Sequence, residues 1–92
     1  MKPSVEAVIT RGNGPSLEVL LGRRMVDAGH VAWDLPGGFL NADDHLYDAL
    51  RRECLREMGV SVEVGDLLGA FEDDFYGSRI VSLVYGVPHC VG

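Results

Sequence analysis

Residues 37–60 read GGFLNADDHLYDALRRECLREMGV and are the most informative part of the sequence. It consists of a glycine pair, a short acidic loop and a segment that predicts a helix from about Asp44 to Met58. In that segment apolar residues recur at the spacing of one helical face, with Cys54 beside them: Leu46, Ala49, Leu50 and Met58. Gly59 then supplies a residue that tolerates the left-handed conformation in which many helices end.

The acidic loop carries residues that commonly begin a helix. Asn41, Asp43 and Asp44 have short polar side chains that can accept hydrogen bonds from the free N–H groups of a first turn. Carboxylates at this end also suit the positive end of the helix dipole. We therefore expect these residues to cap the helix.

A second face of the predicted helix is charged. Glu53, Arg56 and Glu57 stand at i, i+3 and i+4, so their side chains project together. Two carboxylates one turn apart can share a hard cation such as Mg²⁺, which prefers oxygen ligands and usually keeps several waters. The alternative is an ordinary solvated face of ion pairs, which is the commoner meaning of such a string in an isolated helix. The glycine-rich segment before the helix favours the functional interpretation.

The spacing of these residues is specific. Counted from Gly38, the stretch contains Asp44, the pair Arg52-Glu53, then Glu57 and the closing pair Gly59-Val60. This pattern closely resembles the signature of the Nudix hydrolases, in which glycine, glutamate, Arg-Glu, Glu-Glu and a final glycine stand at these positions. Two residues depart from it. Arg56 replaces the first glutamate of the Glu-Glu pair, and Asp44 replaces a glutamate.

The resemblance covers nearly the whole chain and implies an α/β (α+β) fold, a mixed sheet with the helix of the signature, shortened at its C-terminal end. It implies hydrolysis of a diphosphate linkage in a nucleotide or other nucleoside diphosphate derivative by Mg²⁺-assisted attack of water, with Mn²⁺ as an alternative ion. By position, the implied metal ligands are Glu53, Glu57 and the carbonyl of Gly38.

The resemblance also implies roles for neighbouring residues. The implied catalytic set is Glu53, Glu57 and Arg52, in which Arg52 pairs with Asp44 and holds the loop against the helix. Residues expected to contact the substrate lie on a strand end, on the helix and in the glycine pair: Arg23, Arg24, Arg56, Gly37 and Gly38. Trp33 is expected to pack under the loop rather than to stack on a base.

Arg56 opens a second hypothesis. At roughly 5 Å and an effective dielectric constant of about 20, its repulsion of each unit of metal charge is on the order of 3 kcal/mol as an upper estimate. Arg56 could instead pair with Glu53 or contact a substrate phosphate, a geometry that suits a guanidinium. The acidic run 72–74 is an alternative source of a metal ligand. The competing function is a degenerate Nudix module that binds a nucleotide or a protein partner without turnover.

Composition limits the remaining classes. The 92 residues are expected to form one domain, 1–92, and 47% of them are hydrophobic, which argues against disorder. A formal net charge of −6 argues against general binding of nucleic acid or anionic membranes. The two cysteines have no metal-type spacing, and we expect a reduced, cytoplasmic setting. No apolar stretch predicts a signal peptide or a membrane span.

The rest of the chain predicts strands around the helix. Strands are expected over residues 5–10, 17–21, 60–64, 67–71 and 80–87, the first two forming an antiparallel hairpin. Residues 23–32 and the acidic run 72–74 are expected to be loops.

The resemblance predicts self-association. Nudix domains normally continue with further sheet and a second helix over the other sheet face, whereas this sequence ends at Gly92. Because uncovered apolar sheet surface favours association, we expect either a homo-oligomer or a segment shortened relative to its family. Sedimentation over a wide concentration range tests this, and a stable monomer throughout would contradict it.

Overall fold

The computed structural model describes residues 1–92, and its centre is a four-stranded mixed sheet with the order β6-β1-β9-β8. The strands are β6 (Gly37–Phe39), β1 (Lys2–Val8), β9 (Ser78–Gly86) and β8 (Leu67–Phe75). β1 runs parallel to β9 and antiparallel to β6, and β8 and β9 form a long antiparallel ribbon. The mixed α+β architecture predicted from the sequence is confirmed.

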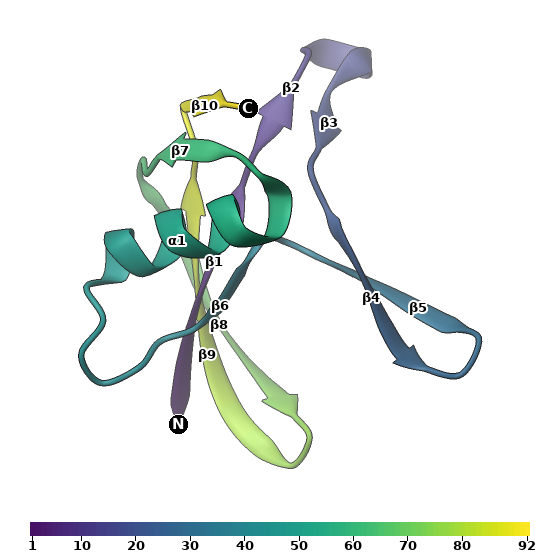
Figure 1. Ribbon diagram of the computed structural model, residues 1–92, viewed down its shortest axis with the longest axis vertical. Coiled ribbons are helices and arrows are strands. Elements are labelled where there is room, and N and C mark those ends of the chain that lie inside the picture. The colour runs from purple at the N-terminus through teal and green to yellow at the C-terminus, as the bar shows by residue number, and fades with distance from the viewer.

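Three short strand pairs surround this sheet. β2 (Thr10–Arg11) pairs with β3 (Glu18–Val19) across a 3₁₀ turn at Gly14–Ser16. The expected hairpin is thus present at its turn end, whereas residues 5–8 belong to β1. β7 (Ser61–Glu63) pairs with β10 (His89–Val91) near the C-terminal end. β4 (Gly22–Asp27) and β5 (His30–Asp34) form a hairpin that extends away from the sheet (Figure 1).

The helix α1 (Leu46–Met58) packs across one face of the sheet (Figure 1). Its apolar stripe meets alternate residues of β1 and of the position just after it, and these residues form most of the core: Val5, Ala7 and Ile9 with Ala49, Leu50 and Cys54. Burial raises the pKa of the Cys54 thiol to about 11, so Cys54 is a neutral apolar side chain. Gly59 ends the helix in the left-handed conformation, as predicted. α1 is too short and too polar to cross a membrane.

The expected helix cap is wrong. The helix begins at Leu46 after His45, which makes no side-chain cap. Residues 41–44 form a separate turn instead, in which the Asp44 N–H donates to the Asn41 carbonyl at 3.0 Å. The carboxylate of Asp44 is therefore used within the loop and not at the first turn of the helix.

Two expected loops are strands. Residues 23–32 belong mostly to the β4–β5 hairpin, whose turn contains Gly29 at φ +81°, a conformation that glycine adopts without strain. The acidic run 72–74 lies within β8 and pairs with β9. Its acids occur on a largely exposed strand, where Arg79 forms ion pairs with Glu72 at 3.6 Å and Asp74 at 3.5 Å. Both segments were predicted to be loops because they contain many charged residues.

The other sheet face carries a small polar cluster on β1 and β9. The Ser4 hydroxyl donates to Glu6 Oε1 at 2.8 Å and lies 3.2 Å from the Ser82 hydroxyl. Glu6 Oε2 is buried without a hydrogen-bond partner. Burial raises the pKa of Glu6, and the two hydroxyls partly offset this shift.

Glu6→Gln is expected to stabilise the protein at pH 7.5 by about 1 kcal/mol, because it removes a half-buried charge that has one unpaired oxygen. The folded-state pKa lies above the unfolded value. The wild type therefore loses stability relative to the variant as pH rises from the unfolded to the folded pKa. Urea unfolding of both proteins from pH 4 to 8 measures the difference. A difference that stays constant with pH, or grows toward low pH, would contradict this assignment.

Candidate active site

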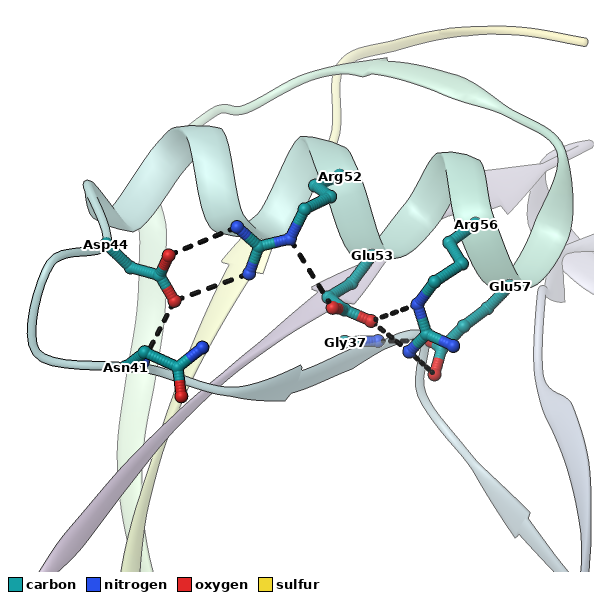
Figure 2. Close-up of polar contacts among 7 residues, drawn as sticks. All are labelled: Gly37, Asn41, Asp44, Arg52, Glu53, Arg56 and Glu57. Carbon is teal, nitrogen blue, oxygen red and sulfur yellow. Dashed lines mark hydrogen bonds and ion pairs between the residues drawn. The ribbon is translucent and has the colours of Figure 1, made fainter.

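The loop before α1 is held to the helix by Arg52. Arg52 donates through Nη1 to Asp44 Oδ1 at 3.1 Å and through Nη2 to Asp44 Oδ2 at 3.3 Å (Figure 2). The Asn41 N–H donates to the same carboxylate at 2.8 Å. The Arg52 guanidinium and this N–H lower the pKa of Asp44. The expected Arg52–Asp44 pair is therefore present, and the shorter aspartate still spans the gap.

Glu53 lies against the glycine pair. Its side chain is only 13% exposed, although it belongs to the charged face of the helix. A Cβ added at Gly38 would lie 3.3 Å from the Glu53 carboxyl carbon, closer than most real contacts. Gly38 therefore leaves the room that this carboxylate occupies.

Glu57 is tied to the same strand, one residue earlier. The Gly37 N–H donates to Glu57 Oε1 at 3.0 Å (Figure 2). This bond engages Oε1 and leaves Oε2 available for another contact. β6 and the last two turns of α1 thus bring Glu53, Glu57 and the glycine pair together, as the sequence spacing predicts.

Arg56 lies between the two carboxylates (Figure 2). Its Nε donates to Glu53 Oε2 at 3.0 Å, and its Nη2 also contacts that oxygen. The same Nη2 lies 3.5 Å from Glu57 Oε2. The hydrogen bond and charge of Glu53 raise the pKa of Arg56 further above its ordinary value. The ion pair with Glu53, one of the arrangements weighed from sequence, is present.

The oxygen donors fit a divalent cation that is shared with a substrate. No third His, Cys, Asp or Glu joins Glu53 and Glu57 to make a larger cluster. The acids of β8 lie on the sheet edge opposite β6, so they are not the replacement ligands considered above. Mg²⁺ is commonly held by one or two carboxylates, with water and substrate phosphates completing its shell. Two carboxylates that lie against a glycine pair, Glu53 beside Gly38 and Glu57 beside Gly37, suit this chemistry.

A cavity of about 680 Å³ opens beside Glu57. Its walls come from β4, β5 and the end of α1, and they include Arg23 and Arg24, the two arginines of β4 that were expected to contact a substrate. Other residues of the wall are Trp33, Asp34, Glu57 and Met58. A larger cavity of about 930 Å³ lies next to it, has mainly apolar walls and contains neither Glu53 nor Glu57. The smaller cavity is therefore the candidate site.

The two arginines of β4 differ in their surroundings. Arg24 donates to Asp34 Oδ2 at 2.7 Å and lies over the ring of Phe75, with 5.7 Å between the guanidinium carbon and the ring centroid. Arg23 has no ion-pair partner and is the freer of the two. Trp33 is 62% exposed, so the expectation that it packs under a loop is wrong.

The cavity residues that sequence reasoning missed include Asp34 and Met58. Asp34 holds Arg24 in place across the β4–β5 pair, and Met58 reaches Gly22, where an added Cβ would lie 2.7 Å from its terminal methyl carbon. The signal for Asp34 was the hairpin itself. Once β4 and β5 are paired, residues 24 and 34 are diagonal neighbours on one face.

The family model of the NUDIX domain matches residues 1–90 of the sequence. The chain belongs to the Nudix family. It is 38% identical to a MutT-like protein of Streptomyces ambofaciens over 82 residues, which are 89% of this chain and 48% of that protein. Members of the family generally use divalent metal ions and act on small nucleotide derivatives.

Solved structures of Nudix-type proteins share the fold. The E. coli ORF135 protein matches with a TM-score of 0.83 and 26% identity, over 99% of this chain and 63% of that one. A MutT Nudix hydrolase from Burkholderia pseudomallei matches with a TM-score of 0.81 and 26% identity, over 99% of this chain and 69% of that one. The chain spans 44 to 48% of the length of the curated relatives that it matches.

Proposed function

We propose that this Nudix chain is a Mg²⁺-dependent hydrolase, with Mn²⁺ as an alternative ion, that cleaves a diphosphate linkage in a nucleotide or other nucleoside diphosphate derivative. One observation carries the proposal. Glu53 and Glu57 lie side by side against the glycine pair, and Glu57 also forms part of the wall of a cavity that contains Arg23 and Arg24. Oxygen ligands for a cation and positive side chains for phosphates therefore meet at one place.

The proposed roles of the residues follow from their contacts. Glu53 and Glu57 would hold the ion, and the backbone of Gly38 approaches Glu53 closely because no side chain intervenes. When bound, the ion supplies neutralisation of diphosphate oxygens and a lower pKa for an attacking water. Gly37 orients Glu57 through its N–H.

The surrounding residues would bind the substrate and keep the site in shape. Arg23 is available for a phosphate because no carboxylate engages it, whereas Arg24 is oriented by Asp34. A guanidinium binds phosphate through paired N–H donors, so these side chains orient the diphosphate beside the carboxylates. Arg52 positions the loop through Asp44 and need not touch the substrate.

A substrate screen tests the proposal. Nucleoside triphosphates, nucleoside diphosphate sugars and dinucleoside polyphosphates are incubated with the protein in Mg²⁺, Mn²⁺ or EDTA, and released phosphate and nucleotide are quantified. We expect release from at least one class, in metal only. Ligand-induced thermal stabilisation that needs no metal, without release from any class, would support the module without turnover instead.

A further inference from the structure

We propose that Arg56 is a displaceable counter-ion: it occupies the Glu53–Glu57 pair in the free protein, a divalent cation must displace it, and a diphosphate favours that exchange by binding the released guanidinium. The inference rests on the proposed function, since it takes Glu53 and Glu57 as the metal-binding pair. It adds a coupling between binding of the cation and binding of the diphosphate, which Glu53 and Glu57 alone would not produce.

The contacts of Arg56 show that it stands where a cation would stand. Its guanidinium contacts Glu53 Oε2 through two nitrogens and lies 3.5 Å from Glu57 Oε2 (Figure 2). These are the oxygens that an ion shared by the two carboxylates would use. The same oxygens cannot keep their contacts with Arg56 and also ligate an ion at close range. Metal and guanidinium therefore compete for this pair.

Arg56 is also free to leave. Its side chain is 65% exposed, and its polar contacts are with Glu53 and Glu57 alone. Arg52 differs, because its hydrogen bonds to Asp44 hold it in place even though its Nε lies 3.6 Å from Glu53 Oε1. Displacing Arg56 costs its contacts with the two acids and disturbs no other part of the fold.

A diphosphate gives the displaced guanidinium a new partner. The Glu57 side chain that Arg56 contacts forms part of the wall of the 680 Å³ cavity, so a phosphate bound there lies within reach of the arginine. A guanidinium forms charge-assisted, paired hydrogen bonds with phosphate oxygens. Each ligand therefore assists the other, and the assistance is reciprocal because it is a coupling of binding equilibria.

Binding of Mn²⁺, followed by electron paramagnetic resonance of the free ion, tests the inference without catalysis. Mn²⁺ is titrated into the wild type, Arg56→Gln, Arg56→Lys and the control Arg51→Gln, with and without methylenediphosphonate, a diphosphate that cannot be hydrolysed. Mn²⁺ bound by the diphosphonate in solution is measured separately. Arg51 lies on the same helix and pairs with Asp48, so its loss changes net charge equally without touching the carboxylate pair.

We expect Arg56→Gln to bind Mn²⁺ about tenfold more tightly than the wild type, below the full Coulomb estimate because the arginine is exposed and screened. Diphosphonate should tighten Mn²⁺ binding by the wild type and have much less effect on Arg56→Gln. Arg56→Lys keeps the charge but loses the paired donors, so its response to diphosphonate should lie between those of the wild type and Arg56→Gln. Arg51→Gln should match the wild type.

Three other results would contradict the inference, each in a different part. Equal Mn²⁺ affinity in the wild type and Arg56→Gln, or equal tightening in Arg51→Gln, would overturn the inference and leave the proposed function standing. Undiminished coupling in Arg56→Gln would overturn the role of Arg56 toward the diphosphate. Failure of every variant to bind Mn²⁺, even with diphosphonate, would overturn the proposed metal site as well.

Discussion

Replacing Glu57 with glutamine is expected to lower kcat/KM for metal-dependent hydrolysis by at least about a hundredfold, because the amide carries no charge for the cation or for the proton of an attacking water. The fold should survive. A glutamine carbonyl can still accept the Gly37 N–H, so the side chain keeps its place against β6. Initial rates of phosphate release, measured at several Mg²⁺ concentrations with the most active substrate of the screen, give the effect.

The matched control is Glu63→Gln. Glu63 lies on β7, is largely exposed and has only a 3.7 Å contact with His89. This variant makes the same chemical change away from the cavity and should keep wild-type kcat/KM. Melting temperatures of both variants should stay near that of the wild type. Wild-type rates in Glu57→Gln at saturating Mg²⁺ would remove this residue from the mechanism.

Replacing Gly37 with alanine should reduce the free energy of unfolding by about 3 kcal/mol or more, a large share of a small domain's stability. An added Cβ would lie 1.9 Å from the Val5 carbonyl oxygen and 2.8 Å from the Glu6 Cα. Both atoms belong to the backbone of β1, the strand that pairs with β6. No side chain can move aside to relieve the clash, so the β1–β6 pairing must open. Urea unfolding followed by circular dichroism measures the loss.

Gly29→Ala separates this clash from backbone strain. Gly29 also has a positive φ, +81°, but an added Cβ there meets no atom within 4 Å. Its alanine variant should lose only about 1 kcal/mol, the strain of the left-handed conformation. Equal losses at the two positions would show that close packing of β6 on β1 is not what requires glycine at residue 37.

The helix could be predicted because its determinants are local. Apolar residues at one helical spacing set its buried face, and Gly59 set its end, so only the start was misplaced. The hairpin of residues 22–34 could not be predicted in the same way. Its strands are mostly exposed, so they lack the regular alternation of buried and exposed residues that marks a strand. Backbone pairing and the exposed Arg24–Asp34 ion pair link them.

The candidate site divides along the same line. Glu53, Arg56 and Glu57 are neighbours by helix geometry, and Arg52 with Asp44 by the spacing of the family signature, so these contacts could be expected. The cavity could not, because it joins α1 to β4 and β5 through tertiary packing that no local spacing encodes. The pairing of Arg24 with Asp34 depends on the register of two strands in the same way.

The parallel pairing of β1 with β9 brings Lys2 beside Ile80 and Val8 beside Gly86. Bringing two strands so far apart in the sequence together has an entropic cost and slows folding relative to helical proteins. During translation β1 is synthesised before β9, so the edge of β1 that pairs with β9 stays unpaired until residues 80–86 have been made. Helix α1 is likewise synthesised before β9, the strand that completes the sheet beneath it. The sheet beneath the candidate site is therefore completed only after the segments that form the site have been synthesised.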